Sequence, residues 1–408
     1  MTDPSVDADP VENAPAGDAF YTPPDPLPHG DRGDLIYQRR LDNAVAALDD
    51  ADNWLVLYRS QDAQGSAVAT SGIIALPRRE PPAGGFPVIS WAHGTVGVGD
   101  LCAPSRDAPT SQAHPMNVYV HTLLNALLRE GWAVAMTDYE GLGTTGRRHP
   151  YLLGVSEAAG VLDMVRAARR LFGPRISSRC AIVGHSQGGQ AALFAASQAP
   201  ACSDLDLVGV AAIAPANHVS GNVRAGALLA VKNEGYGFTP LLLCGAMAGD
   251  RQIRPDQVLS DIAFRQYWPH VDQRCRAGLS KDDSWGGLLG TQQFRPPYPT
   301  VPNDDQRRFD AQLEAMNPAV TLSVPARIVQ AADDKRVQAN PPPPLKGTDQ
   351  LVSELQNLNS NTGQPLIYQR YPEGEVTPDD QLGAHFATIN HDLPHLIDWL
   401  QPLLQPAN

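Results

Sequence analysis

The chain has few cysteines, few basic side chains and no long apolar run. Five cysteines among 408 residues are too few for a disulfide scaffold, and no C-x-x-C pair suggests zinc. The chain has 31 Lys and Arg residues and 44 Asp and Glu residues. The resulting formal charge of −13 opposes binding to nucleic acid or to an anionic membrane. No apolar stretch reaches the roughly 18 residues of a membrane span. We therefore expect no nucleic-acid partner and no transmembrane segment, and the negative charge favours neutral substrates.

The first residues also lack the features of a folded or exported segment. Residues 1–18 contain acids, Pro and Ala without Lys, Arg or apolar periodicity, so they are predicted to form a flexible tail. The opening MTDPSVDADP has neither the basic region nor the apolar core of a secretory signal.

What the chain does have is an alternation of short β-branched runs with helical runs. The expected strands are NWLVLY, AVATSGIIAL, PVISWAH, WAVAMTDY, CAIVG, LVGVAAIAP, ARIVQAAD and PLIYQRY, and the expected helices are HTLLNALLREG, SEAAGVLDMVRAARRLFG, QAALFAASQA and HLIDWLQPLL. This alternation is typical of a mostly parallel central sheet with crossover helices that flank it.

The alternation stops over about 218–317, where Gly and Pro clusters and scattered aromatics take over. Such a long interruption in an α/β domain indicates a cap or lid over the site. We therefore expect a core at 19–217 and 318–408 with the cap at 218–317. Trp285 and Phe294 are candidate acyl-pocket residues, because the segment has more aromatics than a solvated loop needs.

The strongest motif is GHSQGG at 184–189, between the strand CAIVG and the helix QAALFAASQA. It matches a nucleophile elbow, a sharp turn that presents Ser186 at a helix N-terminus. A carbonyl attacked there becomes an oxyanion and needs two N–H donors. Gln187 is expected to supply one, and Thr95, in the turn that follows PVISW, is nominated for the other. The alternative is that His93 and Gly94 only shape that turn.

In this arrangement an acid and then a histidine follow the nucleophile along the chain. Asp334 follows the strand ARIVQ and His385 follows PLIYQRY. Asp333 and His391 are the competing candidates. His391 is set aside because Pro394 suits the first turn of the terminal helix, which would leave His391 before that helix.

Two further patterns favour other chemistry. GLGTTG at 141–146 fits a dinucleotide-binding loop, but Arg, His and Pro follow where a helix should begin. His391 and His395 have the spacing of a metal pair, yet Pro394 lies between them, so they are not expected to share a helical face. We predict no metal and no cofactor.

The cysteines divide by context. Cys180 and Cys244 lie in apolar runs and are expected to be buried thiols. Cys102 and Cys275 lie in polar loops and are hypothesised to form a disulfide that ties the loop after the oxyanion turn to the cap. The alternative is two exposed free thiols.

With these residues in place, the chain resembles the microbial secretory lipase family of the α/β-hydrolase superfamily. The resemblance rests on FYTPP at 20–24, LPHG at 27–30, GDL at 33–35, HGT at 93–95, DYEGLG at 138–143, HPY at 149–151 and the motif at 184–189. It implies the α/β-hydrolase fold with an inserted cap, hydrolysis of carboxylic esters without a cofactor, and a triad of Ser186, Asp334 and His385. The chain departs from the family at the acid loop, which begins with Ala331 instead of Gly and continues with Lys335 and Arg336 instead of apolar residues.

The predicted function is thus a lipase or carboxylesterase that acts through an acyl-enzyme on a small-molecule or lipid ester. A serine peptidase or acyltransferase on the same fold is the nearest alternative, and a non-catalytic binding protein is a more distant one. The resemblance implies secretion if a leader was removed, and otherwise a cytoplasmic location. Oligomeric state and acyl-chain length stay open.

Overall fold

The computed structural model describes residues 10–377 and 383–405, and its centre is a nine-stranded sheet of order β1-β2-β3-β5-β4-β6-β7-β8-β9. β1 to β3 are antiparallel and β3 pairs antiparallel with β5, whereas every pair from β5 to β9 is parallel. The strands are β1 (Leu35–Arg40), β2 (Ala51–Gln61), β3 (Ala67–Pro77), β4 (Phe86–Ala92), β5 (Ala133–Thr137), β6 (Ile176–His185), β7 (Asp206–Ile213), β8 (Ala326–Ala331) and β9 (Leu366–Tyr371).

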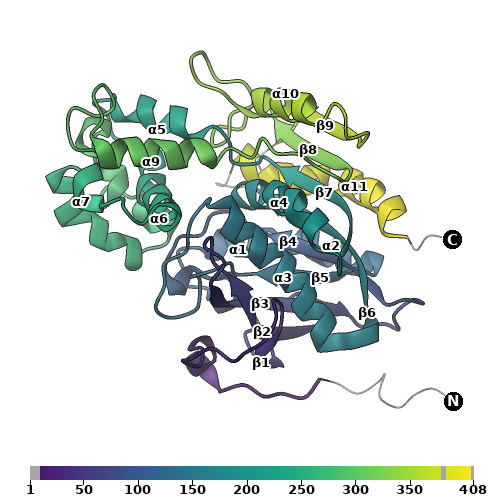
Figure 1. Ribbon diagram of the computed structural model, residues 1–408. Helices are drawn as coiled ribbons and strands as arrows, with labels where there is room; N and C mark the ends of the chain where they lie inside the picture. Colours follow the sequence, from purple (N-terminus) through teal and green to yellow (C-terminus); the bar gives the residue numbers. More distant parts are fainter. Residues whose placement is uncertain (1–9, 378–382, 406–408) are drawn as a thin grey trace, which may run out of the picture.

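Helices cover both faces of the sheet (Figure 1). α3 and α4 pack against each other and against the central strands, while α2 and α11 contact each other and the sheet. β4, β5 and β8 are buried at every residue, as expected for strands covered on both sides. The helices are α1 (His114–Tyr119), α2 (His121–Glu130), α3 (Gly154–Phe172), α4 (Gln187–Gln198), α5 (Val219–Ala227), α6 (Thr239–Gly249), α7 (Pro255–Val258), α8 (Arg276–Leu279), α9 (Asp304–Ala315), α10 (Thr348–Leu358) and α11 (Ala384–Leu404).

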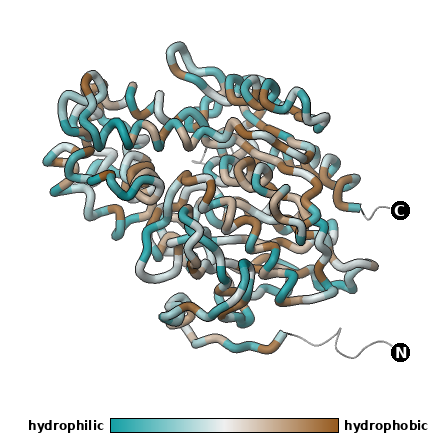
Figure 2. The backbone as a smooth tube through the Cα atoms, viewed as in Figure 1, coloured by the Kyte–Doolittle hydropathy of each residue, from teal (hydrophilic) through white to brown (hydrophobic). Residues whose placement is uncertain are grey.

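Helices α5 to α9 lie between β7 and β8 and form a separate lobe at the left of Figure 1. This lobe, which we call the cap, has its own apolar cluster, in which Trp285, Leu241 and Phe309 are fully buried. Figure 2 shows hydrophilic segments on the outer side of the cap and apolar segments along the strands of the sheet. The boundaries 218 and 317 stay a prediction.

The prediction that Trp285 and Phe294 line an acyl pocket was wrong. Both side chains belong to the apolar cluster inside the cap, with exposed fractions of 0% and 4%. Trp285 Nε1 also donates to the Tyr267 carbonyl at 3.0 Å. The aromatics of this stretch mostly build the core of the cap, because a lobe of five short helices needs large side chains to exclude water.

A disulfide joins Cys102 and Cys275, as hypothesised, and closes a span of 173 residues. Next to it, the Arg276 N–H donates to the Val96 carbonyl at 2.8 Å, so the cap is attached to the loop after β4 at two adjacent points. Gly97 has a φ of 149°, and a Cβ there would lie 2.8 Å from Cys102 Sγ. Cys180 and Cys244 are free and buried, as expected.

The terminal helix differs from the prediction. α11 begins at Ala384 and runs through Pro394, so His391 and His395 lie on one helix, contrary to the expectation. The turns before Pro394 bury Ala384, Phe386 and Ile389, and this packing offsets the roughly 3 kcal/mol that an interior proline costs. Within the described ranges, no group of three metal-ligating side chains occurs.

The segment after β5 lacks the helix of a dinucleotide site. After β5 the chain stays irregular until α3 begins at Gly154, so no helix begins directly after GLGTTG as a dinucleotide site requires.

The described part of the N-terminal segment lies against the sheet. Asn13 and Glu12 hydrogen-bond to the backbone of β1. Among the residues described, no helix combines the length and apolar character needed to cross a bilayer.

Candidate active site

The residues nominated from the sequence follow the carboxyl ends of four parallel strands. Thr95 follows β4, Ser186 follows β6, Asp334 follows β8 and His385 follows β9. Because the carboxyl ends of parallel strands lie at one edge of the sheet, ligands of open α/β sheets bind there. The fold therefore gathers these loops on one side of the molecule.

Ser186 lies in a tight turn between β6 and α4, with φ 58° and ψ −117°. Its backbone is fixed on both sides, since its N–H donates to the Ile213 carbonyl and its carbonyl accepts from the Ala216 N–H, both at 2.9 Å. A Cβ at Gly184 would lie 2.0 Å from the Gly188 carbonyl oxygen, so no larger residue fits there. The strained serine backbone is held by the surrounding turn, as in a nucleophile elbow.

Asp334 and His385 form a buried pair. His385 Nδ1 donates to Asp334 Oδ2 at 2.6 Å, and the two residues are 4% and 2% exposed. Asp334 Oδ1 also accepts from the backbone N–H groups of Arg336 and Val337 at 2.8 and 3.0 Å. Burial alone would raise the pKa of Asp334, but His385 and these donors lower it below its usual value. The carboxylate thus stays ionised and fixes the imidazole tautomer.

The competing residues lie elsewhere. Asp333 accepts a hydrogen bond from the Gly374 N–H at 3.3 Å. His391 lies within α11, with Nε2 at 3.6 Å from a Glu375 carboxylate oxygen. The structure therefore brings His385 together with Asp334, and not with Asp333.

His185, the residue before the nucleophile, was not nominated from the sequence. His185 Nε2 donates to the His385 carbonyl at 2.9 Å, so the residue before Ser186 holds the backbone of the first turn of α11. Burial and the neighbouring His385 lower the pKa of His185 well below its usual value, which keeps the ring neutral. Its place inside the 184–189 motif was the one signal available.

On the other side of Ser186, the Gln187 side chain is held in a fully buried polar cluster. Its Nε2 donates to Glu157 Oε1 and to His149 Nε2, both at 2.7 Å. His149 Nδ1 donates to the Glu140 carbonyl at 2.9 Å, and Glu157 Oε1 accepts from the Leu152 N–H at 2.8 Å. The motifs at 138–143 and 149–151 thus brace the first residue of α4, whose N–H is the nominated oxyanion donor.

Thr95 lies next to this cluster. Its hydroxyl hydrogen-bonds to the Tyr151 hydroxyl at 2.8 Å. His93 Nδ1 donates to the Gly94 carbonyl at 2.7 Å, and burial lowers the pKa of His93 to about 4. His93 is therefore a neutral ring that shapes the turn, while Thr95 faces the cavity described next.

Thr95, Ser186 and His385 line a cavity of about 440 Å³ between the core and the cap. No hydrogen bond joins the Ser186 hydroxyl to His385 among the described residues. Such a contact often forms only when substrate is bound. The cap contributes Leu229, Tyr236, Phe238 and Leu242 to the wall, and the loop after β8 contributes Lys335 to Gln338.

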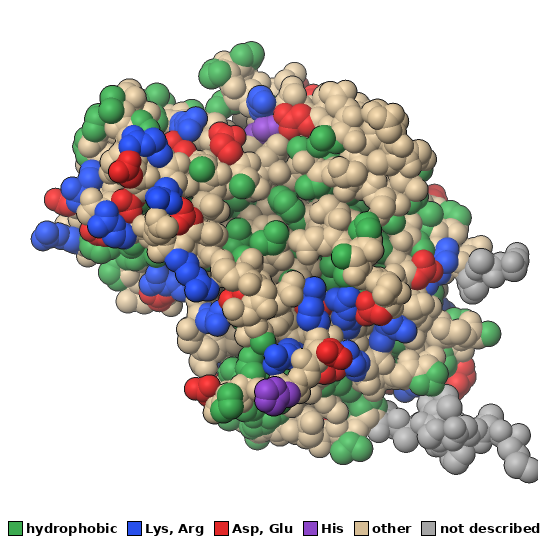
Figure 3. All heavy atoms as spheres, in the orientation of Figure 1, with side chains coloured by type: hydrophobic (Ala, Val, Ile, Leu, Met, Phe, Trp, Pro, Cys, Tyr) green, Lys and Arg blue, Asp and Glu red, His purple; other side chains and the backbone are tan. Residues whose placement is uncertain are grey.

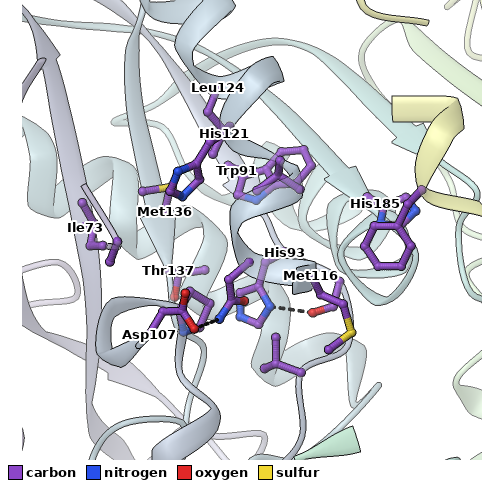
Figure 4. Close-up of a pocket in the computed structure, with 17 residues that line it drawn as sticks. Ile73, Trp91, His93, Asp107, Met116, His121, Leu124, Met136, Thr137 and His185 are labelled. Atoms are coloured by element: carbon purple, nitrogen blue, oxygen red, sulfur yellow. Dashed lines mark hydrogen bonds between the residues drawn. The ribbon is translucent and has the colours of Figure 1, made fainter. Parts of the chain in front are cut away.

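A second cavity, of about 40 Å³, lies behind the turn after β4. Figure 4 shows His93, Met116 and Trp91 around it, with His185 beside the start of α11. Asn117 donates to Asp107 at 3.1 Å on its polar side. This cavity is far smaller than the one lined by Ser186 and His385, so the larger cavity is the candidate site for a substrate.

Residues 110–254 match the secretory lipase family. The matched segment includes the motifs at 138–143, 149–151 and 184–189, while the positions of Thr95, Asp334 and His385 lie outside it. Lipase A of Moesziomyces aphidis is 26% identical over 200 residues, which are 48% of this chain and 42% of that protein. A Mycobacterium tuberculosis protein named "Probable inactive lipase" is 30% identical over 230 residues, or 53% and 49% of the two chains. The chain spans less than half of these relatives.

Solved structures show the fold over nearly the whole chain. The rice cell wall degrading esterase LipA of Xanthomonas oryzae superposes with a TM-score of 0.72 at 19% identity, over 92% of this chain and 100% of that one. Candida antarctica lipase A superposes with a TM-score of 0.70 at 20% identity, over 95% and 86% of the two chains. The fold is that of the α/β-hydrolases.

Proposed function

We propose that this protein is a serine hydrolase that cleaves carboxylic esters through an acyl-enzyme. The observation that carries the proposal is the pairing of buried Asp334 with His385 at 2.6 Å, since His385 lines the same cavity as the strained Ser186. The family match and the lipases among the relatives support this reading.

In the proposed reaction, Ser186 Oγ attacks the ester carbonyl carbon while His385 Nε2 takes the hydroxyl proton. The carbonyl oxygen becomes an oxyanion, which the backbone N–H groups of Thr95 and Gln187 stabilise. Asp334 stabilises the imidazolium formed in this step. The imidazolium gives its proton to the departing alkoxide, so an alcohol leaves and the acyl group stays on Ser186.

Water completes the cycle. His385 removes a proton from water as the water oxygen attacks the acyl-enzyme, and the proton then returns to Ser186 Oγ as the carboxylic acid leaves. An alcohol in place of water would give transacylation. A peptidase would use the same steps on an amide.

A fluorophosphonate probe tests the activated serine. The wild-type protein is expected to be labelled at Ser186, and the Ser186→Ala variant to be unlabelled, as read by peptide mass mapping. Hydrolysis of p-nitrophenyl esters without hydrolysis of peptide p-nitroanilides is expected and separates an esterase from a peptidase. The reverse selectivity would contradict the proposal.

A non-catalytic protein is the second candidate, because one relative is named a probable inactive lipase. That candidate predicts no labelling of Ser186 and no ester turnover, even with the pair of Asp334 and His385 in place. The same probe experiment therefore decides between the two.

A further inference from the structure

The charges that line the large cavity differ from those of the whole chain. The chain has a formal charge of −13, which favours neutral or cationic partners. Around the cavity, Glu234 is the single acidic residue among the described lining residues, and it is exposed. Four basic residues line the same cavity: Arg276, Lys335, Arg336 and Lys346. The site of the proposed chemistry is therefore locally basic.

Arg276 is the unusual member of this group. Its residue is 6% exposed, and within the described residues no carboxylate lies within ion-pair distance of its guanidinium. Its recorded side-chain contacts are Nη1 to the Ser280 hydroxyl at 3.4 Å, Nη2 to Met116 Sδ at 3.6 Å, and the Phe238 ring at 5.5 Å. A long hydroxyl contact, a sulfur and an aromatic face are weak partners for five N–H donors.

Burying a charge without a carboxylate partner is costly. Burial and the nearby Arg336 lower the pKa of Arg276 to about 10, against a smaller opposing effect of the exposed Glu234, and the group is still charged at neutral pH. The other lining cations are different: Lys346, for example, is exposed and lies 3.5 Å from Glu354. Arg276 thus carries a desolvated positive charge that a bound anion would compensate.

The backbone holds Arg276 in place beside the catalytic turn. Cys275 is bonded to Cys102, and the Arg276 N–H donates to the Val96 carbonyl, one residue after Thr95. A residue fixed to the core and the cap at once is suited to orient a ligand relative to the nucleophile. Figure 3 shows basic and acidic side chains intermixed over the cap surface, so the excess of basic residues belongs to the cavity and not to that face.

We propose that Arg276 binds a carboxylate carried by the ester substrate. The planar guanidinium matches a carboxylate through two parallel hydrogen bonds, and the apolar wall from Leu229, Phe238 and Leu242 suits a hydrocarbon linker. The substrate class is accordingly a half-ester of a dicarboxylic acid, in which one end is the scissile ester and the other is the anion. The inference rests on the proposed ester hydrolysis for its reaction.

The experiment compares matched esters. The kcat/KM is measured for the monoethyl esters of the dicarboxylic acids from succinic to sebacic, and for the ethyl esters of unbranched monocarboxylic acids of the same length. At its best length, the anionic ester is expected to be hydrolysed at least as well as its neutral partner. An anionic series that is more than about tenfold poorer at every length would overturn the proposal.

Three variants locate the effect. Arg276→Met keeps the unbranched stem of the side chain but removes the guanidinium group, and it is expected to lower kcat/KM for the best anionic ester about 10- to 100-fold, the usual range for hydrogen bonds to a charged group. The kcat/KM of this variant for the neutral ester is expected to change less than about threefold. Arg276→Lys should recover part of the loss, because it restores the charge without the fork.

Arg274→Met is the matched control. Arg274 lies two residues earlier, pairs with Asp283 at 2.6 Å and is not among the cavity-lining residues. The Arg274→Met variant removes the same charge, and it is expected to change kcat/KM for neither the anionic nor the neutral esters by more than about threefold. If Arg276→Met lowered kcat/KM equally for the anionic and the neutral esters, the effect would be structural and the proposal would be overturned. If Arg274→Met lowered kcat/KM for the anionic esters as much as Arg276→Met does, the effect would be one of bulk charge, which would also overturn the proposal.

A binding measurement separates this inference from the proposed function. Calorimetry with monoethyl suberate and the Ser186→Ala protein is expected to show binding that Arg276→Met in the same background weakens at least about tenfold. Arg276-dependent binding without ester turnover in the wild type would leave the anion site standing and refute the hydrolase. Turnover of neutral esters without Arg276-dependent binding would do the opposite.

Discussion

The edge of the sheet and the cap meet on one cavity but contribute different kinds of residue to it. The core contributes Ser186, directly after β6, Asp334, in the loop after β8, and His385, in the first turn of α11. Each is fixed by backbone hydrogen bonds or buried partners. The cap contributes apolar side chains and Arg276. Among the described residues, these side chains form no hydrogen bond with Asp334, with His385 or with the turn at Ser186. Under the proposed function, this difference assigns the chemistry to the core and the choice of substrate to the cap.

Replacing the nucleophile is the strongest test of that division. Ser186→Ala is expected to lower kcat by at least about 10⁴-fold, because loss of the nucleophile removes the covalent route and leaves only binding and oxyanion effects. Stability should change little, since no hydrogen bond of the Ser186 hydroxyl is recorded among the described residues. Steady-state kinetics with an ester checks it. A variant that keeps more than a tenth of the wild-type kcat would contradict the assignment of the nucleophile.

The acid and base assignments come next. His385→Ala and Asp334→Asn are each expected to lower kcat by about 10³- to 10⁴-fold, since the first removes the proton acceptor and the second allows the wrong tautomer. The controls are the neighbouring candidates, His391→Ala and Asp333→Asn, which should stay within about tenfold. Were His391→Ala the inactive variant instead, the base would have to be reassigned from His385, in the first turn of α11, to His391 further along the same helix.

Within the cap, stability and selectivity should separate. Trp285→Ala is expected to lower the free energy of unfolding by about 3–5 kcal/mol, because it empties a fully buried site in the cap core. Leu229→Ala, at a half-exposed position on the cavity wall, should cost less than about 1 kcal/mol. It should instead shift the preferred acyl length. Urea unfolding and a chain-length series of esters measure the two effects, and a shifted series in Trp285→Ala with unchanged stability would reverse these roles.

The disulfide tests how firmly the two regions are joined. A Cys102→Ser, Cys275→Ser double variant is expected to lose about 2–5 kcal/mol of stability, because the bridge constrains a long loop in the unfolded chain. Thermal unfolding with and without reductant measures the loss. The wild type in reductant should approach the double variant, and the double variant should not respond to reductant. An unchanged wild type under full reduction would show that the cap is held without the bridge.

The two regions also differ in how well the sequence predicts them. The strands of the parallel sheet were predicted because buried strands are continuous apolar runs, and AVAMT in β5 is an example. β1 was missed because LIYQRR is half-buried throughout and ends in two arginines. Ser186, Asp334 and His385 could be nominated in that order because strand ends and turn residues leave a local pattern.

In the cap, local pattern was not enough. The excess of aromatics correctly indicated apolar burial, but composition does not distinguish the interior of a lobe from the wall of a cavity, and Trp285 lies in the former. Arg276 was not singled out from the sequence, because composition does not show burial and a basic residue in a polar loop is expected to be solvated. The polar cluster around Gln187 joins Glu157 and His149, which no sequence spacing connects.

The bridge between Cys102 and Cys275 has a consequence for the integrity of the chain. Residues 228–235 are exposed, and the described cap chain there includes Lys232, which makes this stretch open to tryptic cleavage. A cut at Lys232 would divide the polypeptide between the two bridged cysteines. The nicked molecule should therefore migrate as one species in electrophoresis without reductant and as two fragments with it, so that backbone scission in this stretch goes unnoticed until the sulfurs are reduced.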